Sequence, residues 1–588
     1  MVNVLSGPVQ ELLMVLIQNK NGKRLRPKVV SSYFSQNKTM NNTTWGSLII
    51  EELTRLGTYH FCIAPGSRST PLVAAIARHP KAQAHIFIDE RSAAFFALGL
   101  SKYNNVPAVM VTTSGSAMTH AYPAVIEAEA HNIPLLLLSA DRPPELRNTG
   151  ANQTIDQNQL FGNHVQFFVD LPCPNSHFSA HNLVSLIDHA VSRTQNGPVH
   201  INCMFRKPLD PQPTKLPNLW YDDGPYSRLV TIQPQTDWNV PAHKRAILVI
   251  GMLKNQTDQE HALLIAQKAQ CPIFCDAASG IRLNNIPNTL YPIDTIVQFD
   301  TQRPMFTPDI IVHLGGTFVS KQLPKWLAKQ KCPIIQISPV QKRTQRGSHT
   351  QILASIPQDI GTLTHPLHVH SLQTLIEERI ENACLKDFNE PSIIRACTKS
   401  LPAHTSLFVS NSMPVRDINR FARTHHEWIR IGINRGASGI DGIVATAAGW
   451  THASKNPAVL LIGDIASIHD IGSLLQLSTR KIPLLVCIIN NGGGGIFSFL
   501  PIAQEEDIFE DYFATAHKTT IALITRAMGI PSFCIENHPD FQHALSRFHK
   551  NPRFSVLEIH TNRSDNHRVH QQLNHAITQT LSTFAGST

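Results

Sequence analysis

Apolar residues along most of the chain form short runs that alternate with segments of helical periodicity. In the first third, this pattern predicts strands at residues 59–65, 84–88, 107–113, 133–139 and 197–203, with helices between them. The predicted strands are apolar on both faces, which is typical of a parallel sheet covered by helices on both sides. We therefore expect an α/β domain here.

Two further α/β segments follow a linker, residues 211–242, which is rich in Pro, Asp and Gln and lacks periodicity. The second segment has strands starting near residues 246, 271, 309 and 333. After a polar, His-rich passage, the third has strands near 406–411, 428–433, 458–463, 482–489 and 553–560. The chain is thus predicted to be α/β, with three doubly wound parallel-sheet domains at residues 43–210, 243–370 and 371–588.

The net charge of +9 comes from 51 basic and 42 acidic residues, and +5 of it falls within residues 1–40. The rest of the chain is mildly basic, which suits anionic small molecules as well as nucleic acid. The extension at 1–42 fits either a transit peptide or a non-native leader before a start at Met40, and we favour the start at Met40.

No apolar run approaches the ~20 residues of a membrane span, so a transmembrane protein is excluded. The ten cysteines contain no Cys-x-x-Cys pair, and the closest two, Cys271 and Cys275, fall in a predicted buried strand. This usage is typical of a reducing, cytoplasmic compartment without disulfides or a zinc site.

Ligands of open parallel sheets bind beyond the carboxyl ends of the strands, so the loops that follow strands are candidate sites. The loop at residues 64–71 places Arg68 before a helix that Ser69 or Thr70 can cap, which suits an anion, although an ordinary turn with a solvated arginine has the same pattern. Glu90 precedes a helix predicted at 93–100, where an acid is usually a cap.

A stronger pattern lies in the third segment. Asp464 ends one predicted strand and Asn491 ends the next, 27 residues later, with one helix predicted between them and glycines at 492–495. A single crossover then brings a carboxylate and an amide oxygen together, which suits magnesium bound with a diphosphate. No lysine follows the glycines, so this is not a Walker A loop.

The pattern of Gly463-Asp464 and Asn490-Asn491 resembles the motif of thiamine-diphosphate-dependent enzymes, whose other signature is a glutamate such as Glu90. Further motifs resemble a menaquinone-pathway family of this superfamily: residues 65–72 (PGSRSTPL), 139–145 (SADRPPE), 150–153 (GANQ), 434–441 (NRGASGID) and 496–501 (IFSFLP). The resemblance implies a transferase that decarboxylates 2-oxoglutarate with thiamine diphosphate and Mg²⁺ or Mn²⁺ and adds the succinic semialdehyde carbanion to isochorismate. It also implies pyrimidine-binding, middle and diphosphate-binding domains.

The resemblance assigns roles by motif position. Glu90 would bond the aminopyrimidine ring, and Ile440 would bend the cofactor. Metal ligands would be Asp464, Asn491 and the Gly493 carbonyl, and Gly463, Ile465 and Ile496 would lie along the cofactor. The substrate carboxylates would meet Arg68, Arg142, Lys321, Arg416 and Arg435, beside Gln153, Ser412 and the apolar Phe497 and Leu500.

Two positions depart from the family pattern. Gln322 stands where a second basic residue is common, and Gly492 stands where a third Asn is frequent. The superfamily also implies at least a homodimer, or a homotetramer, without nucleic-acid partners. Two alternatives are another thiamine-dependent enzyme, whose members lack this set of arginine-bearing loops, and a noncatalytic anion- or nucleic-acid-binding protein.

Overall fold

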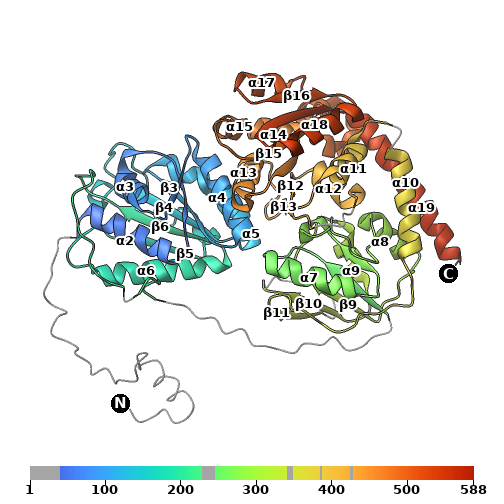
Figure 1. The fold of residues 1–588 in the computed structure, drawn as a ribbon, viewed down its shortest axis with the longest axis horizontal. Coiled ribbons are helices and arrows are strands. Elements are labelled where there is room, and N and C mark those ends of the chain that lie inside the picture. The colour runs from blue at the N-terminus through green and yellow to red at the C-terminus, as the bar shows by residue number, and fades with distance from the viewer. Residues whose placement is uncertain are drawn as a thin grey trace, which may run out of the picture.

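The computed structural model describes residues 40–220, 222–227, 245–340, 349–384, 387–423 and 428–587. In these residues three all-parallel sheets form three α/β units, coloured blue to teal, green, and yellow to red along the chain (Figure 1). The predicted fold class is confirmed. Residues 1–39 of the N-terminal extension and residues 221 and 228–242 of the linker lie outside the described residues.

The N-terminal sheet has the strand order β2-β1-β3-β4-β6-β5. Its strands β3, β4 and β6 are wholly buried. Its elements are α2 (Asn42–Arg55), β1 (His60–Ile63), α3 (Thr70–Arg78), β2 (Gln83–Ile86), α4 (Glu90–Asn104), β3 (Ala108–Thr112), α5 (Tyr122–His131), β4 (Leu135–Asp141), β5 (Phe167–Leu171), α6 (Ala180–Arg193) and β6 (Pro198–Met204).

The middle sheet has the order β11-β10-β9-β7-β8. Cys275 lies in β8 and Cys271 just before it, and both are buried as expected. The elements are β7 (Ala246–Ile250), α7 (Gln256–Lys268), β8 (Ile273–Cys275), α8 (Ile293–Gln302), β9 (Ile310–Leu314), α9 (Gln322–Lys329), β10 (Ile334–Ser338) and β11 (His349–Leu353).

The C-terminal sheet has the order β13-β12-β14-β15-β17-β16, which repeats the topology of the N-terminal sheet strand for strand. Its elements are α10 (His370–Cys384), α11 (Glu390–Ser400), β12 (Ser406–Val409), α12 (Met413–Phe421), β13 (Ile431–Ile433), α13 (Ile443–Ser454), β14 (Ala458–Gly463), α14 (Asp464–His469), α15 (Ile471–Leu477), β15 (Leu484–Asn490), α16 (Glu506–Ile508), α17 (Ile521–Ala527), β16 (Ser532–Ile535), α18 (His538–Lys550), β17 (Ser555–His560) and α19 (Arg563–Ser587).

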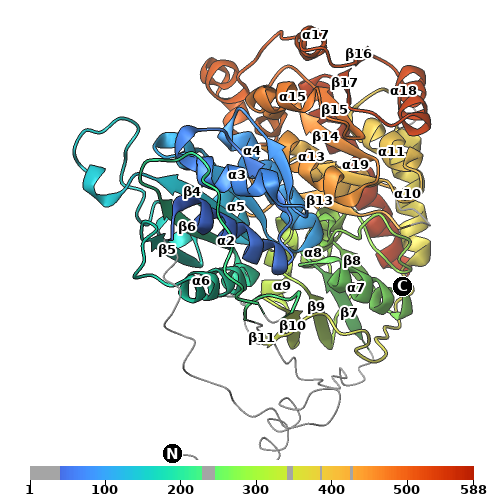
Figure 2. The ribbon, with the colours of Figure 1, turned by 60° about the vertical axis from the view of Figure 1, so that its left-hand side comes forward.

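The outer units share one apolar core, because α4 of the first packs along α13 of the third. Phe95 and Phe96 of α4 and Ala447, Ala448 and Trp450 of α13 all belong to this core. The long α19 packs on α10 and reaches α8, so it ties the C-terminal unit to the middle one. Figure 2 shows the three units gathered around these contacts.

The sequence prediction missed three strands, β5, β11 and β16, each at the edge of its sheet. A fourth edge strand, β2, was predicted at 84–88 as apolar on both faces, but it spans Gln83–Ile86 and only His85 is buried. An edge strand has a neighbour on one side only, so its sequence need not be continuously apolar.

Candidate active site

A cavity of about 410 Å³ opens at the carboxyl edge of the third sheet. From β12 the strand order runs to β13 on one side and to β14 on the other, and open α/β sheets bind ligands at such a reversal. Many of the residues predicted from the sequence line this cavity: Ser412, Arg416, Arg435, Ile440, Gly463, Asp464, Ile465, Asn491, Gly493, Ile496, Phe497 and Leu500.

Asp464 and Asn491 follow two neighbouring strands. Strands β14 and β15 pair in parallel with Gly463 opposite Ile489, so the two side chains emerge at the same edge. The single helix predicted between them is wrong, because the crossover contains two helices, α14 and α15, that meet at Asp470. Asp464 Oδ2 accepts a hydrogen bond of 2.9 Å from the Gly493 N–H, which joins both halves of the motif.

The glycines of the motif leave backbone open to the cavity. A Cβ at Gly463 would meet no atom within 4 Å, so the chain there faces empty space. Gly493 has a φ of 152°, and a Cβ on it would lie 2.6 Å from the Ala514 carbonyl oxygen. Only glycine therefore allows this tight approach beside Asp464.

The side chain of Asn491 is placed as a cation ligand would be. Its Oδ1 atom is buried and has no hydrogen-bond partner among the described residues, while its Nδ2 donates to Glu390 Oε1 at 2.8 Å. A buried, unpaired amide oxygen beside a carboxylate is costly unless a ligand satisfies it, and both are oxygen donors of the kind that Mg²⁺ takes. The donor set therefore fits a divalent cation.

Glu390 was missed by sequence reasoning. It is buried at the first turn of α11, where its sequence context shows only a capping box formed by Asn389 and Ser392. Burial raises the pKa of Glu390 to about 8, and the charges of Asp417 and Asp464 add to this effect. Burial also raises the pKa of Asp464, while N–H groups of Gly493 and Ile465 partly oppose that rise. A bound cation would offset this accumulation of carboxyl groups.

Arg416 and Arg435 form a basic wall of the same cavity. Arg435 Nη1 donates to Asn411 Oδ1 at 3.3 Å, and Arg416 donates to the Ser412 carbonyl oxygen. Burial, reinforced by the neighbouring Arg435, lowers the pKa of Arg416 to about 10. Two half-buried guanidinium groups that line one cavity favour an anion between them. Asn411, also missed, donates to the Asn434 and Gly439 carbonyls and so holds the loop that carries Arg435.

The loop at 434–441 is also held by the N-terminal unit. Glu127 of α5 accepts hydrogen bonds from the Gly436 and Ala437 N–H groups at 2.9 and 2.7 Å. Lys102 of α4 donates to Asn434 Oδ1 at 2.9 Å. Neither residue stood out in the sequence, because their partners are more than 300 residues away.

Arg68, Arg142 and Gln153 gather at the equivalent edge of the first sheet. Arg68 is buried and donates to the Phe205 carbonyl oxygen at 2.6 Å, and the Arg142 charge contributes to lowering its pKa after burial. Arg142 donates to the Asn152 carbonyl, next to Gln153, whose amide donates to the Ser114 carbonyl oxygen. Ser69 occupies the N-cap position of α3, as expected, but its side chain makes no capping hydrogen bond and donates instead to the Gly66 carbonyl oxygen. Thr70 donates to the Ser67 carbonyl oxygen.

Glu90 and Lys321 lie outside the cavity in this single chain. Glu90 is the first residue of α4, three residues earlier than the helix was predicted to start, and Asp89 is the cap. The next residue, Arg91, bonds the His469 carbonyl oxygen at the end of α14. Lys321 precedes α9 and is exposed.

Sequence models of three thiamine pyrophosphate enzyme domains match the chain: the N-terminal TPP binding domain at residues 43–160, the middle domain at 214–409 and the C-terminal TPP binding domain at 415–559. A solved benzoylformate decarboxylase from Polynucleobacter necessarius shares the fold, with a TM-score of 0.67 and 14% identity over 88% of this chain and 98% of that one. Together with the cavity, these matches define a thiamine-diphosphate-dependent enzyme.

Similar proteins of known name identify the family within this class of enzymes. The proteins named 2-succinyl-5-enolpyruvyl-6-hydroxy-3-cyclohexene-1-carboxylate synthase from Chlorobium phaeobacteroides and Rubrobacter xylanophilus are each 37% identical to this chain, over 91% and 90% of it and 98% of their own length. The chain belongs to the 2-succinyl-5-enolpyruvyl-6-hydroxy-3-cyclohexene-1-carboxylate synthase family.

Proposed function

We propose that this chain decarboxylates 2-oxoglutarate and adds the remaining four-carbon unit to isochorismate, which yields CO₂ and 2-succinyl-5-enolpyruvyl-6-hydroxy-3-cyclohexene-1-carboxylate for menaquinone biosynthesis. The family membership supplies the reaction. The structural observation that carries the proposal is that a cation motif and two half-buried arginines, Arg416 and Arg435, line the same cavity.

Thiamine diphosphate, when bound, supplies the electron sink for the loss of CO₂. The Asp464 and Asn491 side chains and the Gly493 carbonyl would hold Mg²⁺ or Mn²⁺, and the open backbone at Gly463 and Ile465 would meet the diphosphate. Ile440 and Ile496 would flank the cofactor on its apolar side.

Arg416 and Arg435 are proposed to bind and orient substrate carboxylates. Both substrates are dicarboxylates, and a guanidinium fork pairs with a carboxylate through two hydrogen bonds. The Ser412 hydroxyl would add one more contact, while Phe497 and Leu500 would exclude water from the reacting carbon. A carboxylate between the two arginines would also offset the burial of Arg416 and the charge of Arg435, which together lower the pKa of Arg416.

A second copy of the chain is proposed to complete the site. The smallest active unit would then be a homodimer, and a homotetramer could contain the same dimer. Arg68, Arg142 and Gln153 lie together but outside the cavity of their own chain, as do Glu90 and Lys321. In the partner's site, the Glu90 carboxyl would share a proton with the aminopyrimidine ring.

A reducing, cytoplasmic location is proposed from the ten cysteines, which are all free. Among the helices that the structure describes, none is long and apolar enough to cross a membrane.

The test is CO₂ release from 2-oxoglutarate with thiamine diphosphate and Mg²⁺, with and without isochorismate, while isochorismate loss is followed in the same tube. Coupled, isochorismate-dependent turnover is expected. Decarboxylation without isochorismate consumption would keep the cofactor chemistry and overturn the acceptor. Absence of turnover with cofactor bound would overturn 2-oxoglutarate as the donor.

A further inference from the structure

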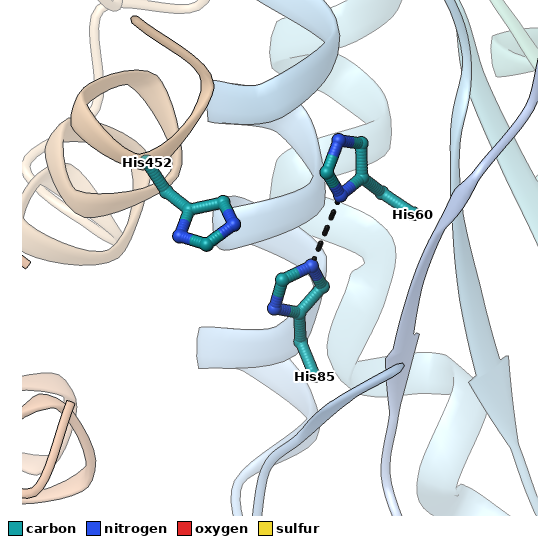
Figure 3. A group of neighbouring side chains, drawn as sticks. All are labelled: His60, His85 and His452. Carbon is teal, nitrogen blue, oxygen red and sulfur yellow. Dashed lines mark hydrogen bonds between the residues drawn. The ribbon is translucent and has the colours of Figure 1, made fainter. Parts of the chain in front are cut away.

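Three histidines that do not line the cavity converge on one another. His60 lies on β1, His85 on the neighbouring strand β2, and His452 near the end of α13 (Figure 3). One ring nitrogen of each lies within 4.8 Å of those of the other two. The group therefore joins the N-terminal sheet to a helix of the C-terminal unit, and nothing in the proposed reaction uses it.

The spacing of these nitrogens is close to that of a metal site. His60 Nδ1 and His85 Nε2 are 3.1 Å apart. Two ligands of a tetrahedral ion are separated by about 3.3 Å when each nitrogen lies about 2.05 Å from the metal. The His452 ring stands edge-on to the other two, at 84° to each, and faces the gap between them in Figure 3. From the 4.8 Å limit, a shift of up to about 1.5 Å would bring its nitrogen to the same distance.

The surroundings keep the imidazoles in the form that binds metal. Burial lowers the pKa of His60 to about 4 and that of His85 to about 3, with the neighbouring His452 adding to both shifts. Burial also lowers the pKa of His452. A neutral imidazole offers one lone pair, so no net loss of a proton is needed near neutral pH. His60 Nδ1 and His85 Nε2 are hydrogen-bonded to each other, so one of these rings would carry its proton on its other nitrogen when both bind the ion.

Two cations face the group and restrict which ion suits it. Lys455 acts on His60 and His452, and Arg480 acts on His85 and His452. The Arg480 guanidinium is itself engaged, since it donates to the Ile86 carbonyl oxygen and lies 4.1 Å from the Phe87 ring centre. Their charge disfavours hard ions such as Mg²⁺, which bind mainly by charge, and leaves ions that form strong bonds to nitrogen.

We propose that His60, His85 and His452 form a binding site for one imidazole-preferring divalent transition-metal ion, with zinc as the reference case. The fourth position is open to water or to an anion that would offset the nearby cations. His60 and His452 are only partly buried, which gives the ion an entry route. The site is separate from the cation motif at Asp464 and Asn491.

A bound ion would clamp α13 to the first sheet. Because α13 starts directly after the loop at 434–441, the clamp would stiffen the support of Arg435 and Ile440 rather than take part in the reaction. The expected effect is therefore on stability, and metal occupancy should raise the unfolding temperature.

The test uses the full-length holoenzyme, freed of transition metals and kept in excess Mg²⁺ and thiamine diphosphate, so that the Asp464 motif is occupied. Zn²⁺ is titrated by calorimetry, and thermal unfolding is followed with and without it. We expect one equivalent to bind and to raise the unfolding temperature. In His452→Gln the affinity should fall by at least about tenfold and the temperature shift should vanish.

His452→Cys distinguishes ligation from packing. A thiolate is itself a zinc ligand, so this variant should keep zinc binding and, with Co²⁺ as probe, should gain a sulfur-to-cobalt absorption band. His177→Gln, at an exposed position of the first unit, is the matched control and should behave as wild type. Unchanged zinc affinity in His452→Gln, or no saturable binding by the wild-type holoenzyme, would overturn the site.

Discussion

Asp464 is the residue on which cofactor binding is expected to depend most. Its carboxylate lines the cavity and is tied to the Gly493 N–H, so removing it deletes one proposed metal ligand and loosens the glycine loop. Asp464→Ala should lower the Mg²⁺-dependent affinity for thiamine diphosphate by about 100-fold or more, since losing even an outer partner costs about 10–100-fold. Calorimetric titration of the cofactor measures this. The exposed Asp511→Asn serves as control, and wild-type affinity in Asp464→Ala would refute the assignment.

Glu390 is expected to act through Asn491, as a positioning residue. Its carboxylate accepts from the Asn491 amide, which leaves Asn491 Oδ1 directed elsewhere and unpaired. Glu390→Leu removes that acceptor and should weaken Mg²⁺ by about 10–100-fold. Glu390→Gln keeps an acceptor oxygen and should lose much less.

The measurement is the Mg²⁺ concentration needed for half-maximal cofactor binding, alongside urea unfolding of each variant. A purely structural role for Glu390 predicts lower stability in Glu390→Leu with an unchanged Mg²⁺ requirement. That result would contradict the positioning role, whereas a raised Mg²⁺ requirement that Glu390→Gln largely restores would support it.

The site residues that could be predicted from the sequence stand in local motifs, whereas the missed ones depend on partners far away in the chain. Asp464, Asn491 and Arg435 stand in local motifs whose residue types have a chemical meaning. The role of Glu390, by contrast, follows from the hydrogen bond that it accepts from Asn491, 101 residues away. Glu127 likewise depends on the loop at 436–437, more than 300 residues away. Such partners are set by tertiary packing, which a single sequence does not display.

At the scale of elements, the contact of α4 with α13 depends on two glycines. A Cβ at Gly99 would lie 2.1 Å from the Thr446 carbonyl oxygen, and one at Gly449 would lie 2.1 Å from that of Phe96. Both clashes involve backbone, so the two helices would have to separate. Gly99→Ala should lower the free energy of unfolding by about 1–3 kcal/mol or more.

The control for this prediction is Gly472→Ala in α15, where a Cβ would meet no atom within 4 Å. Alanine is a better helix former than glycine, so in Gly472→Ala the free energy of unfolding should stay the same or rise by up to about 1 kcal/mol. Urea unfolding of both variants checks the pair. Equal stabilities would mean that the two helices are not held in close contact.

The elements found from the sequence were those with buried surroundings on both sides. Strands such as β4 and β15 are buried along their whole length, and their apolar runs stood out. The strand β16, at the edge of its sheet, is buried only at its two ends, Ser532 and Ile535, and exposed at the two positions between them, a pattern that a short loop can also show. The break between α14 and α15 was missed because it depends on Asp470 bonding the start of α13.

At the scale of the molecule, the first and third sheets share one topology. Each carries a cluster of candidate site residues at its carboxyl edge, after equivalent strands. In the third sheet, the cluster follows β12 and β14. In the first, Arg68 follows β1, and Thr113, which bonds the Arg68 N–H, follows β3. The two clusters are separate within one chain, because the cavity at the third sheet is not lined by Arg68, Arg142 or Glu90. In the proposed dimer, each cluster would be half of a site.

If each site joins the Glu90 of one chain to the Asp464 of another, inactive variants should rescue each other. Glu90→Ala and Asp464→Ala are each expected to fold with little turnover, since one lacks the pyrimidine contact and the other a metal ligand. In a mixed dimer one site would carry both substitutions and the other neither.

After equal mixing with subunit exchange, about a quarter of wild-type turnover should return, because half of the dimers are mixed and each has one intact site. Mixing Asp464→Ala with Asn491→Ala is the control, since both substitutions affect the same half-site and no exchange can restore it. No recovery in the first mixture despite demonstrated exchange would place Glu90 and Asp464 in the same chain's site. Recovery in the control would show that turnover returns without complementary half-sites, and it would overturn the shared site as the cause of rescue.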